Sequence, residues 1–80
     1  MNNEINKKSK EYKLAYEIAD ALNDMDSLEI HISFAESFNE GVLRKIFNRV
    51  MSIPEDKIKR TRGALYTYLV KNHGRFGNRS

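Results

Sequence analysis

Hydrophobic residues recur every three or four positions along most of this chain, which is the spacing of helices that bury one face. The first such pattern predicts a helix that begins after Ser9, a residue that can cap a helix N-terminus. The pair Asn23-Asp24 prefers turns and is expected to end this helix. Its apolar positions are Leu14, Ile18, Ala21, Leu22 and Met25.

Residues 28–34 fit two kinds of structure. Their apolar positions have helical spacing, but they also alternate with polar residues as in a half-buried strand. The chain offers no second strand, and a lone strand leaves its backbone groups unpaired, so we favour a helix. Asp26 and Glu29 have the spacing of a capping box, which predicts that this helix begins at Ser27. In the alternative, two chains pair this strand into an antiparallel ribbon backed by helices, an arrangement that resembles the ribbon-helix-helix repressors.

A second capping-box spacing, Ser37 with Glu40, predicts the start of a third helix. The residues after it show the clearest helical periodicity in the chain, and the opposite face of this helix would carry basic side chains. The apolar positions are Leu43, Ile46, Phe47, Val50 and Met51, and the basic residues are Arg44, Lys45 and Arg49.

The fourth predicted helix starts at Pro54, which suits the first turn of a helix, and runs without interruption to Gly74, which ends it. Gly63 lies inside this helix and indicates a close approach by a neighbouring group, or a bend. Lys57, Arg60, Thr67 and Lys71 are expected on its outer face as a basic stripe. The side chains expected to face the core are Ile58, Leu65 and Leu69, with Thr61 and Tyr68 on one flank.

Together these patterns predict a small all-α domain of four helices at residues 9–74, with a flexible arm at 1–8 and a flexible basic tail at 75–80. Eighty residues leave room for one core, and without cysteine the packing of helices must supply the stability. No apolar run is long enough to span a membrane, and the N-terminus lacks the apolar run of a signal peptide. We therefore expect a cytoplasmic protein that makes no membrane contact.

Charge is distributed unevenly along the chain. Residues 1–40 carry four lysines against nine carboxylates, whereas residues 41–80 carry ten Lys or Arg against two carboxylates, and every arginine lies in the second half. The positive electrostatic field of the second half favours an anionic partner. We expect nucleic acid as the partner, and an acidic protein as the alternative partner. The alternative is that the two halves neutralise each other in the fold.

The sequence offers little for catalysis. It has no H-E-x-x-H motif for zinc, no phosphate-binding loop and no glycine-rich motif for a dinucleotide. Its two histidines lie far apart in the sequence. Asp20, Asp24 and Asp26 lack the glycine and distal glutamate of a calcium loop. We interpret His31 as a boundary residue with a satisfied hydrogen bond, and His73 as a residue that interacts with a helix C-terminus. The expectation is a protein that is not an enzyme and that has no metal, cofactor or small-molecule substrate.

The best functional candidate is the basic second half, where aromatic residues are interspersed with the charge. Arginine and lysine on a rigid helix can contact phosphates, and aromatic rings can stack on unpaired bases. This predicts binding of DNA or RNA by the fourth helix, the exposed face of the third, and the tail; for duplex DNA these two helices would form a helix-turn-helix-like pair. The alternative function is a protein-interaction or regulatory module, such as a small inhibitor or adaptor, that binds a partner or itself. The predicted interface comprises Arg44, Arg49, Lys57, Arg60, Arg62, Lys71 and Arg75, with Tyr66 as a stacking platform.

Overall fold

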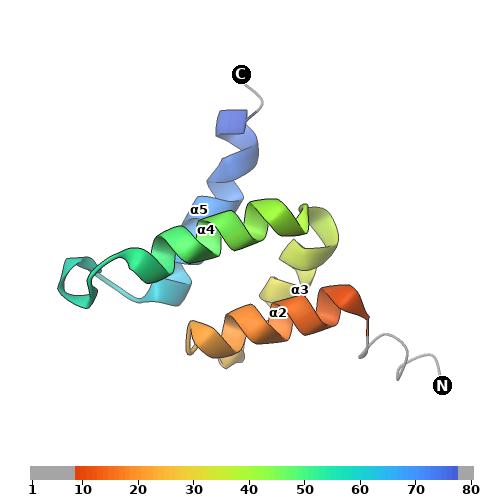
Figure 1. The fold of residues 1–80 in the computed structure, drawn as a ribbon, viewed down its shortest axis with the longest axis horizontal. Helices are drawn as coiled ribbons and strands as arrows, with labels where there is room; N and C mark the ends of the chain where they lie inside the picture. Colours follow the sequence, from red (N-terminus) through yellow and green to blue (C-terminus); the bar gives the residue numbers. More distant parts are fainter. Residues whose placement is uncertain (1–8, 78–80) are drawn as a thin grey trace.

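Four α-helices make up most of the chain in the computed structural model, which describes the backbone of residues 9–77 and the side chains of residues 9–73. Two short 3-10 helices, η1 and η2, lie in the connections, and the described residues contain no strand. The structure therefore confirms the predicted all-α domain of four helices (Figure 1). The elements are α2 (Lys10–Ala21), η1 (Met25–Ser27), α3 (Leu28–Ser37), α4 (Glu40–Ser52), η2 (Glu55–Lys57) and α5 (Arg62–Gly77).

Both ends of α2 are formed by the residues predicted for them. The hydroxyl of Ser9 accepts a hydrogen bond from the backbone N–H of Tyr12 at 3.1 Å, which is an N-cap. At the other end Asn23 has a φ of 57°, in the left-handed region that asparagine tolerates better than most residues. The backbone N–H of Asn23 then donates to Asp20 and that of Asp24 to Ala19, at 3.0 and 2.8 Å, a pattern known as a Schellman motif.

Residues 28–34 belong to the helix α3, so the strand and the ribbon-helix-helix arrangement are both wrong. A helix satisfies the backbone groups of this segment internally and buries His31, Phe34 and Ala35 on one face. The predicted capping box is not used. The chain instead enters α3 through η1, and Ser27 makes no side-chain hydrogen bond to the helix N-terminus.

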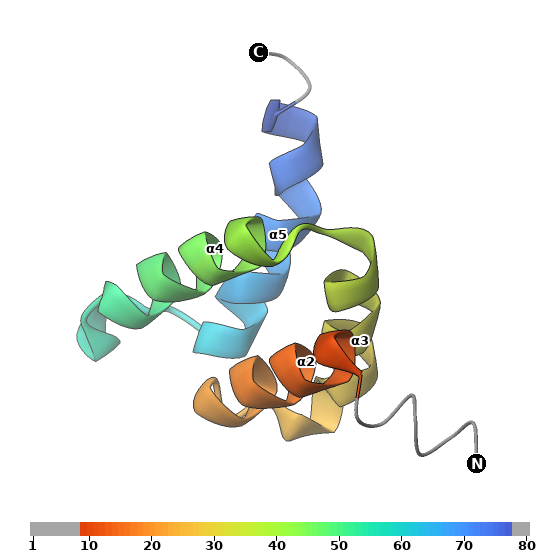
Figure 2. The same cartoon turned by 45° about the vertical axis from the view of Figure 1, so that its right-hand side comes forward.

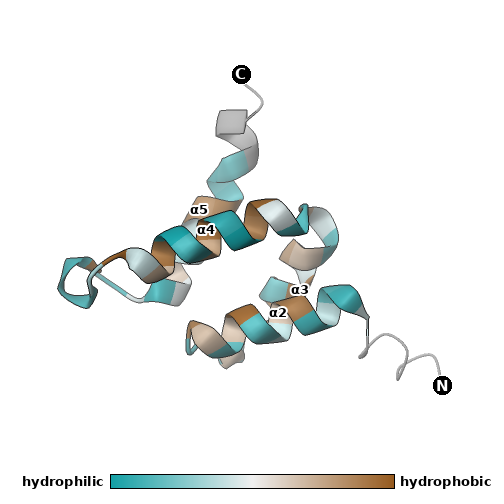
Figure 3. Ribbon diagram, viewed as in Figure 1, coloured by the Kyte–Doolittle hydropathy of each residue, from teal (hydrophilic) through white to brown (hydrophobic). Residues whose placement is uncertain are grey.

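The helix α4 begins three residues after the predicted cap. Ser37 is the last residue of α3 and therefore cannot cap the next helix, so this predicted capping box is wrong. Asn39 is the N-cap, and its side-chain oxygen accepts a hydrogen bond from the N–H of Gly41 at 2.7 Å. The predicted periodicity is confirmed at Leu43, Ile46 and Val50, which are buried, but Met51, predicted for the same face, is 40% exposed. Figure 3 shows the resulting hydrophobic and hydrophilic bands along α4.

The predicted helix from Pro54 to Gly74 is wrong at both ends. The turn η2 follows Pro54, the chain is extended at Ile58, and α5 begins only at Arg62. The hydroxyl of Thr61 accepts a hydrogen bond from the N–H of Ala64 at 3.0 Å, so this threonine acts as an N-terminal cap. The helix then continues past Gly74 to Gly77.

The core lies between two pairs of helices. The helix α2 packs mainly against α3, and α4 packs against α5; the two pairs then enclose one cluster of apolar side chains. The last turns of α5 extend beyond the other helices in both ribbon views (Figures 1 and 2). The buried apolar residues are Leu14, Ala15, Ile18, Leu22, Phe34, Ala35, Leu43, Ile46, Val50, Tyr66 and Val70.

Gly63 confirms the close approach that the sequence indicated. A Cβ atom placed on this glycine would lie 2.7 Å from Cγ of Asp24, which is too close for any real contact. The Asp24 side chain is in turn held by His31, whose Nε2 lies 2.8 Å from Oδ2 of the carboxylate. The first turn of α5 therefore rests directly on the turn that ends α2.

We expect Gly63→Ala to lower the free energy of unfolding by about 1 to 3 kcal/mol, because the added methyl group must displace Asp24 or α5. Urea denaturation followed by circular dichroism measures this change. Asp24→Ala removes the Cγ and Oδ2 atoms that would lie at 2.7 and 2.8 Å and leaves only the Cβ contact at 3.0 Å, so in a chain that carries it the cost of Gly63→Ala should shrink. Equal costs in the two backgrounds would contradict the contact.

Candidate functional site

The predicted basic stripe is not one helix face, because Lys57 and Arg60 lie in the connection between α4 and α5, whereas Thr67 and Lys71 lie on α5 itself. Lys57 and Arg60 precede α5 instead of lying on it. The predicted array of cations along an uninterrupted helix is therefore wrong. Each predicted site residue must be placed by its own contacts.

Arg44 is engaged within the protein. Its Nη2 and Nη1 donate to the two carboxylate oxygens of Glu17 at 3.0 and 3.2 Å, and its Nε donates to Glu40 at 2.9 Å. The hydrogen bond from Arg44 lowers the pKa of the Glu17 carboxyl, and the bonds to Glu17 and Glu40 raise the pKa of the guanidinium. Here the acidic and basic halves of the chain do neutralise each other, so Arg44 ties α4 to α2.

Arg62 also has a structural contact. Its Nη1 donates a hydrogen bond of 2.7 Å to the backbone carbonyl of Val50. That carbonyl lies in the last turn of α4 and also accepts a longer hydrogen bond, of 3.3 Å, from the backbone N–H of Ile53. Arg62 therefore joins the end of α4 to the start of α5.

Tyr66 is not a stacking platform for a ligand, because only 1% of its surface is exposed. Its ring lies 5.4 Å from the ring of His31 and 6.3 Å from that of Phe34. Burial raises the pKa of the Tyr66 hydroxyl to about 12. The predicted role for Tyr66 is wrong, and its function is to anchor α5 in the core.

The exposed tyrosine of α5 is Tyr68, at 60% of its surface, although the pattern predicted it at the flank of the core. The error comes from taking Ile58 as part of the helix and setting the helical phase from it. The side that faces the core instead carries Gly63, Tyr66 and Val70, at spacings of three and four. The small residue at Gly63, where a neighbour approaches, was the signal that could have set the phase.

The remaining predicted cations are Arg49, Lys57, Arg60 and Lys71, and all four are exposed. None of them forms an ion pair with another residue of the described part of the chain. Lys59, which lies in the connection to α5 between Lys57 and Arg60, is also exposed. The side chain of Arg75 lies outside the described side chains.

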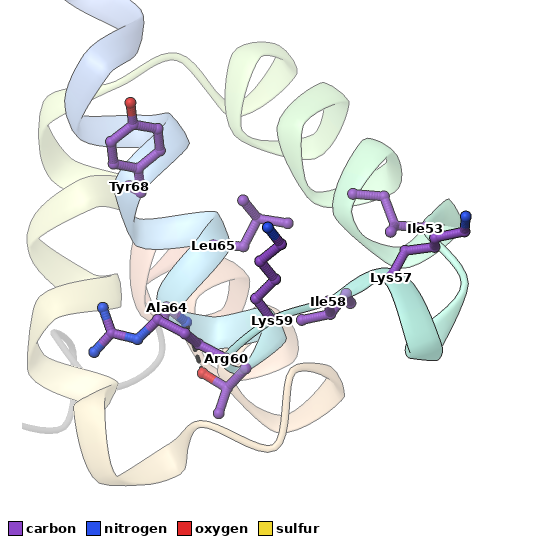
Figure 4. A pocket seen from close by; sticks show the side chains of 9 residues that line it. Ile53, Lys57, Ile58, Lys59, Arg60, Ala64, Leu65 and Tyr68 are labelled. Atoms are coloured by element: carbon purple, nitrogen blue, oxygen red, sulfur yellow. Dashed lines mark hydrogen bonds between the residues drawn. The ribbon is translucent and has the colours of Figure 1, made fainter.

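A groove of about 380 Å³ lies between the α4–α5 connection and the first turns of α5. Its apolar surface comes from Ile53, Ile58, Ala64, Leu65 and the ring of Tyr68. Three cations, Lys57, Lys59 and Arg60, line it together with Thr61. In Figure 4 Lys57 lies beside η2, Arg60 lies on the opposite side, and Lys59 projects between them.

The two carboxylates of the second half do not line this groove. Glu55 lines a separate hollow beside the end of α2, together with Arg60 and Arg62, and Asp56 is exposed on η2. The charged side chains at the groove are therefore all positive. We call Lys57, Lys59, Arg60 and the apolar residues between them the basic groove.

Among the described residues no three His, Cys, Asp or Glu side chains form a group that could hold a metal ion. His31 is 2% exposed, so it is a core residue and not a boundary residue; its Nε2 has the predicted hydrogen bond, but its buried Nδ1 has no partner among the described residues. In the same part of the chain, no helix has the length and apolar character needed to cross a membrane.

Replacing Arg62 by alanine should lower the free energy of unfolding by about 1 to 3 kcal/mol, because the Val50 carbonyl loses a charged donor. Arg60→Ala is the matched control, since that side chain is exposed and should change stability by less than about 0.5 kcal/mol. Thermal or urea unfolding of both variants checks this. Equal stability of the two variants would mean that the contact to Val50 contributes nothing.

Alkaline pH should destabilise the fold through Tyr66. Its pKa is higher in the folded chain than in the unfolded chain, so the folded state binds this proton more tightly. The contribution of Tyr66 to the free energy of unfolding should stay constant below a pH of about 10, the ordinary pKa of tyrosine. It should fall as the pH rises from there to about 12. Unfolding measured across this range should show a shallower decline for Tyr66→Phe. An identical decline in both proteins would contradict the buried hydroxyl.

Comparison with known proteins assigns no relative to this chain. No protein-family model matches it, and neither does any curated protein or solved structure. The candidate function therefore depends on the chemistry of the basic groove.

Proposed function

We propose that this chain is a non-catalytic nucleic-acid-binding domain that holds a phosphate backbone at the basic groove. The observation that carries the proposal is that Lys57, Lys59 and Arg60 line one groove whose charged lining is entirely positive. Phosphate is the ligand class that clusters of lysine and arginine bind through both charge and hydrogen bonds.

The distribution of charge supports this proposal. The acidic first half neutralises Arg44 through Glu17 and Glu40, but none of the ion pairs among the described residues reaches the cations of the basic groove. These side chains are exposed and keep their full donor capacity. Lys71 adds a further exposed cation on α5, close to Tyr68 in the sequence.

The mode of binding differs from the helix-turn-helix expected for duplex DNA. That motif joins its two helices by a turn of about three or four residues. Here residues 53–61 separate α4 from α5 and include the turn η2. The cations lie in this connection, so the proposed contact to phosphate is made by a loop and not by a recognition helix.

The combined change of Lys57→Ala and Arg60→Ala should weaken oligonucleotide binding and reduce its salt dependence. Loss of two phosphate contacts lowers the slope of log K against log salt by about 1.4 to 2 units. Fluorescence anisotropy over a series of salt concentrations measures both quantities. Lys10→Ala with Lys13→Ala, on α2, removes the same charge away from the groove and should leave the slope nearly unchanged.

If both double variants lower the slope equally, binding follows net charge and the groove has no special role. If the variants in the groove bind exactly as the unmodified chain does, the proposed site is wrong. Circular dichroism verifies that each variant is folded.

A protein-interaction module is the second candidate function, and the apolar lining of the same groove favours it. Ile53, Ile58 and Leu65 offer a surface on which an apolar side chain of a partner would fit. Binding of this kind buries apolar area and depends weakly on salt, whereas binding of phosphate is strongly weakened by salt. The salt series therefore separates the two functions.

A further inference from the structure

We infer that the basic groove binds single-stranded nucleic acid in preference to a duplex, with an unpaired base stacked on Tyr68. This inference rests on the proposed function and specifies its ligand. It also transfers the stacking role from the buried Tyr66 to the tyrosine two residues later in α5.

The exposure of Tyr68 is the first argument. Tyr68 is 60% exposed, while the neighbouring Tyr66 packs in the core against His31 and Phe34. Tyr68 takes part in none of the ring pairs within the described part of the chain. An aromatic face left open beside cations is the arrangement by which proteins stack on single-stranded bases.

The lining of the groove is the second argument. Leu65 and Ala64 line the groove together with Tyr68, and Ile58 and Ile53 continue the apolar surface toward α4 (Figure 4). A duplex keeps the faces of its bases stacked inside and presents phosphates and base edges to a protein. An unpaired base exposes an apolar face that such a surface can cover. The groove therefore suits a single strand better than a duplex.

The positions of the cations are the third argument. Lys57, Lys59 and Arg60 lie in the groove that reaches Tyr68 from the side of the connecting loop. A second hollow reaches the same tyrosine from the other side and contains Lys71, which follows it by about 4.5 Å along the helix axis. Asp24 also lines this second hollow, but its carboxylate is hydrogen-bonded to His31 at 2.8 Å. Cations thus lie on both sides of the Tyr68 ring. A nucleic-acid strand whose base stacks on this ring would place phosphates on both sides of it.

The test compares a labelled oligothymidylate, a labelled oligouridylate and a labelled hairpin duplex by fluorescence anisotropy at one salt concentration. We expect tighter binding of the single strands. Tyr68→Ala should lower their affinity by about 5-fold to about 150-fold, the range found when one stacked base is lost, and Tyr68→Phe should retain affinity because the ring remains. Tyr16→Ala is the matched control, because this tyrosine is also exposed, at 47%, but lies on α2.

A second measurement does not depend on a loss of affinity. The chain has no tryptophan, so Tyr68→Trp introduces a single indole at the proposed contact. Stacking of a base on this ring should quench its fluorescence when the oligothymidylate is added. A control with Tyr16→Trp should show no quenching.

The outcomes separate the two proposals. Binding of duplex and single strands with equal affinity, or unchanged binding by Tyr68→Ala without quenching in Tyr68→Trp, overturns this inference and leaves the proposed function in place. Failure of the unmodified chain to bind any of the three probes overturns the proposed function as well. If light scattering then shows a dimer that Tyr68→Ala dissociates, the groove is an interface between two copies of the chain.

Discussion

The hydrogen bond between Asp24 and His31 fixes the relative positions of three helices. Asp24 follows the left-handed residue that ends α2, and its carboxylate oxygen lies 2.8 Å from Nε2 of His31 on α3. The same side chain occupies the space beside Gly63 at the start of α5. In a small chain without disulfides, one buried hydrogen bond of this kind fixes a geometry that apolar packing alone leaves open.

The basic groove is positioned by this core. The ring of His31 packs against Tyr66, and this contact sets the rotation of α5 about its axis. Because neighbouring residues on a helix are separated by about 100°, a buried Tyr66 places Tyr68 about 200° away, on the outer side. Arg62 then holds the start of α5 to the last turn of α4. The loop that carries the cations is thus anchored at both ends.

The sequence predicted the periodic segments well and the connections poorly. The helical interpretation of 28–34 was correct because the backbone of a lone strand has no partner within the chain. The continuous helix after Pro54 was wrong because Ile58 has the right spacing for a helical core position, yet the chain is extended there. Spacing alone cannot distinguish a helix from an apolar residue in a loop. Nor can it reveal a contact such as Arg44 with Glu17, whose partners are 27 positions apart.

Interruption of the helix changes what the cations can do. A continuous helix would present lysine and arginine as a straight row along one face, which suits the regular backbone of a duplex. The observed loop instead brings Lys57, Lys59 and Arg60 around an apolar groove that ends at an exposed ring. These cations line the groove on the loop side of Tyr68, and Lys71 lies in the hollow on its other side. The correction to the fold therefore alters the ligand that we propose, because the residues expected to form a row along one helix instead line one groove.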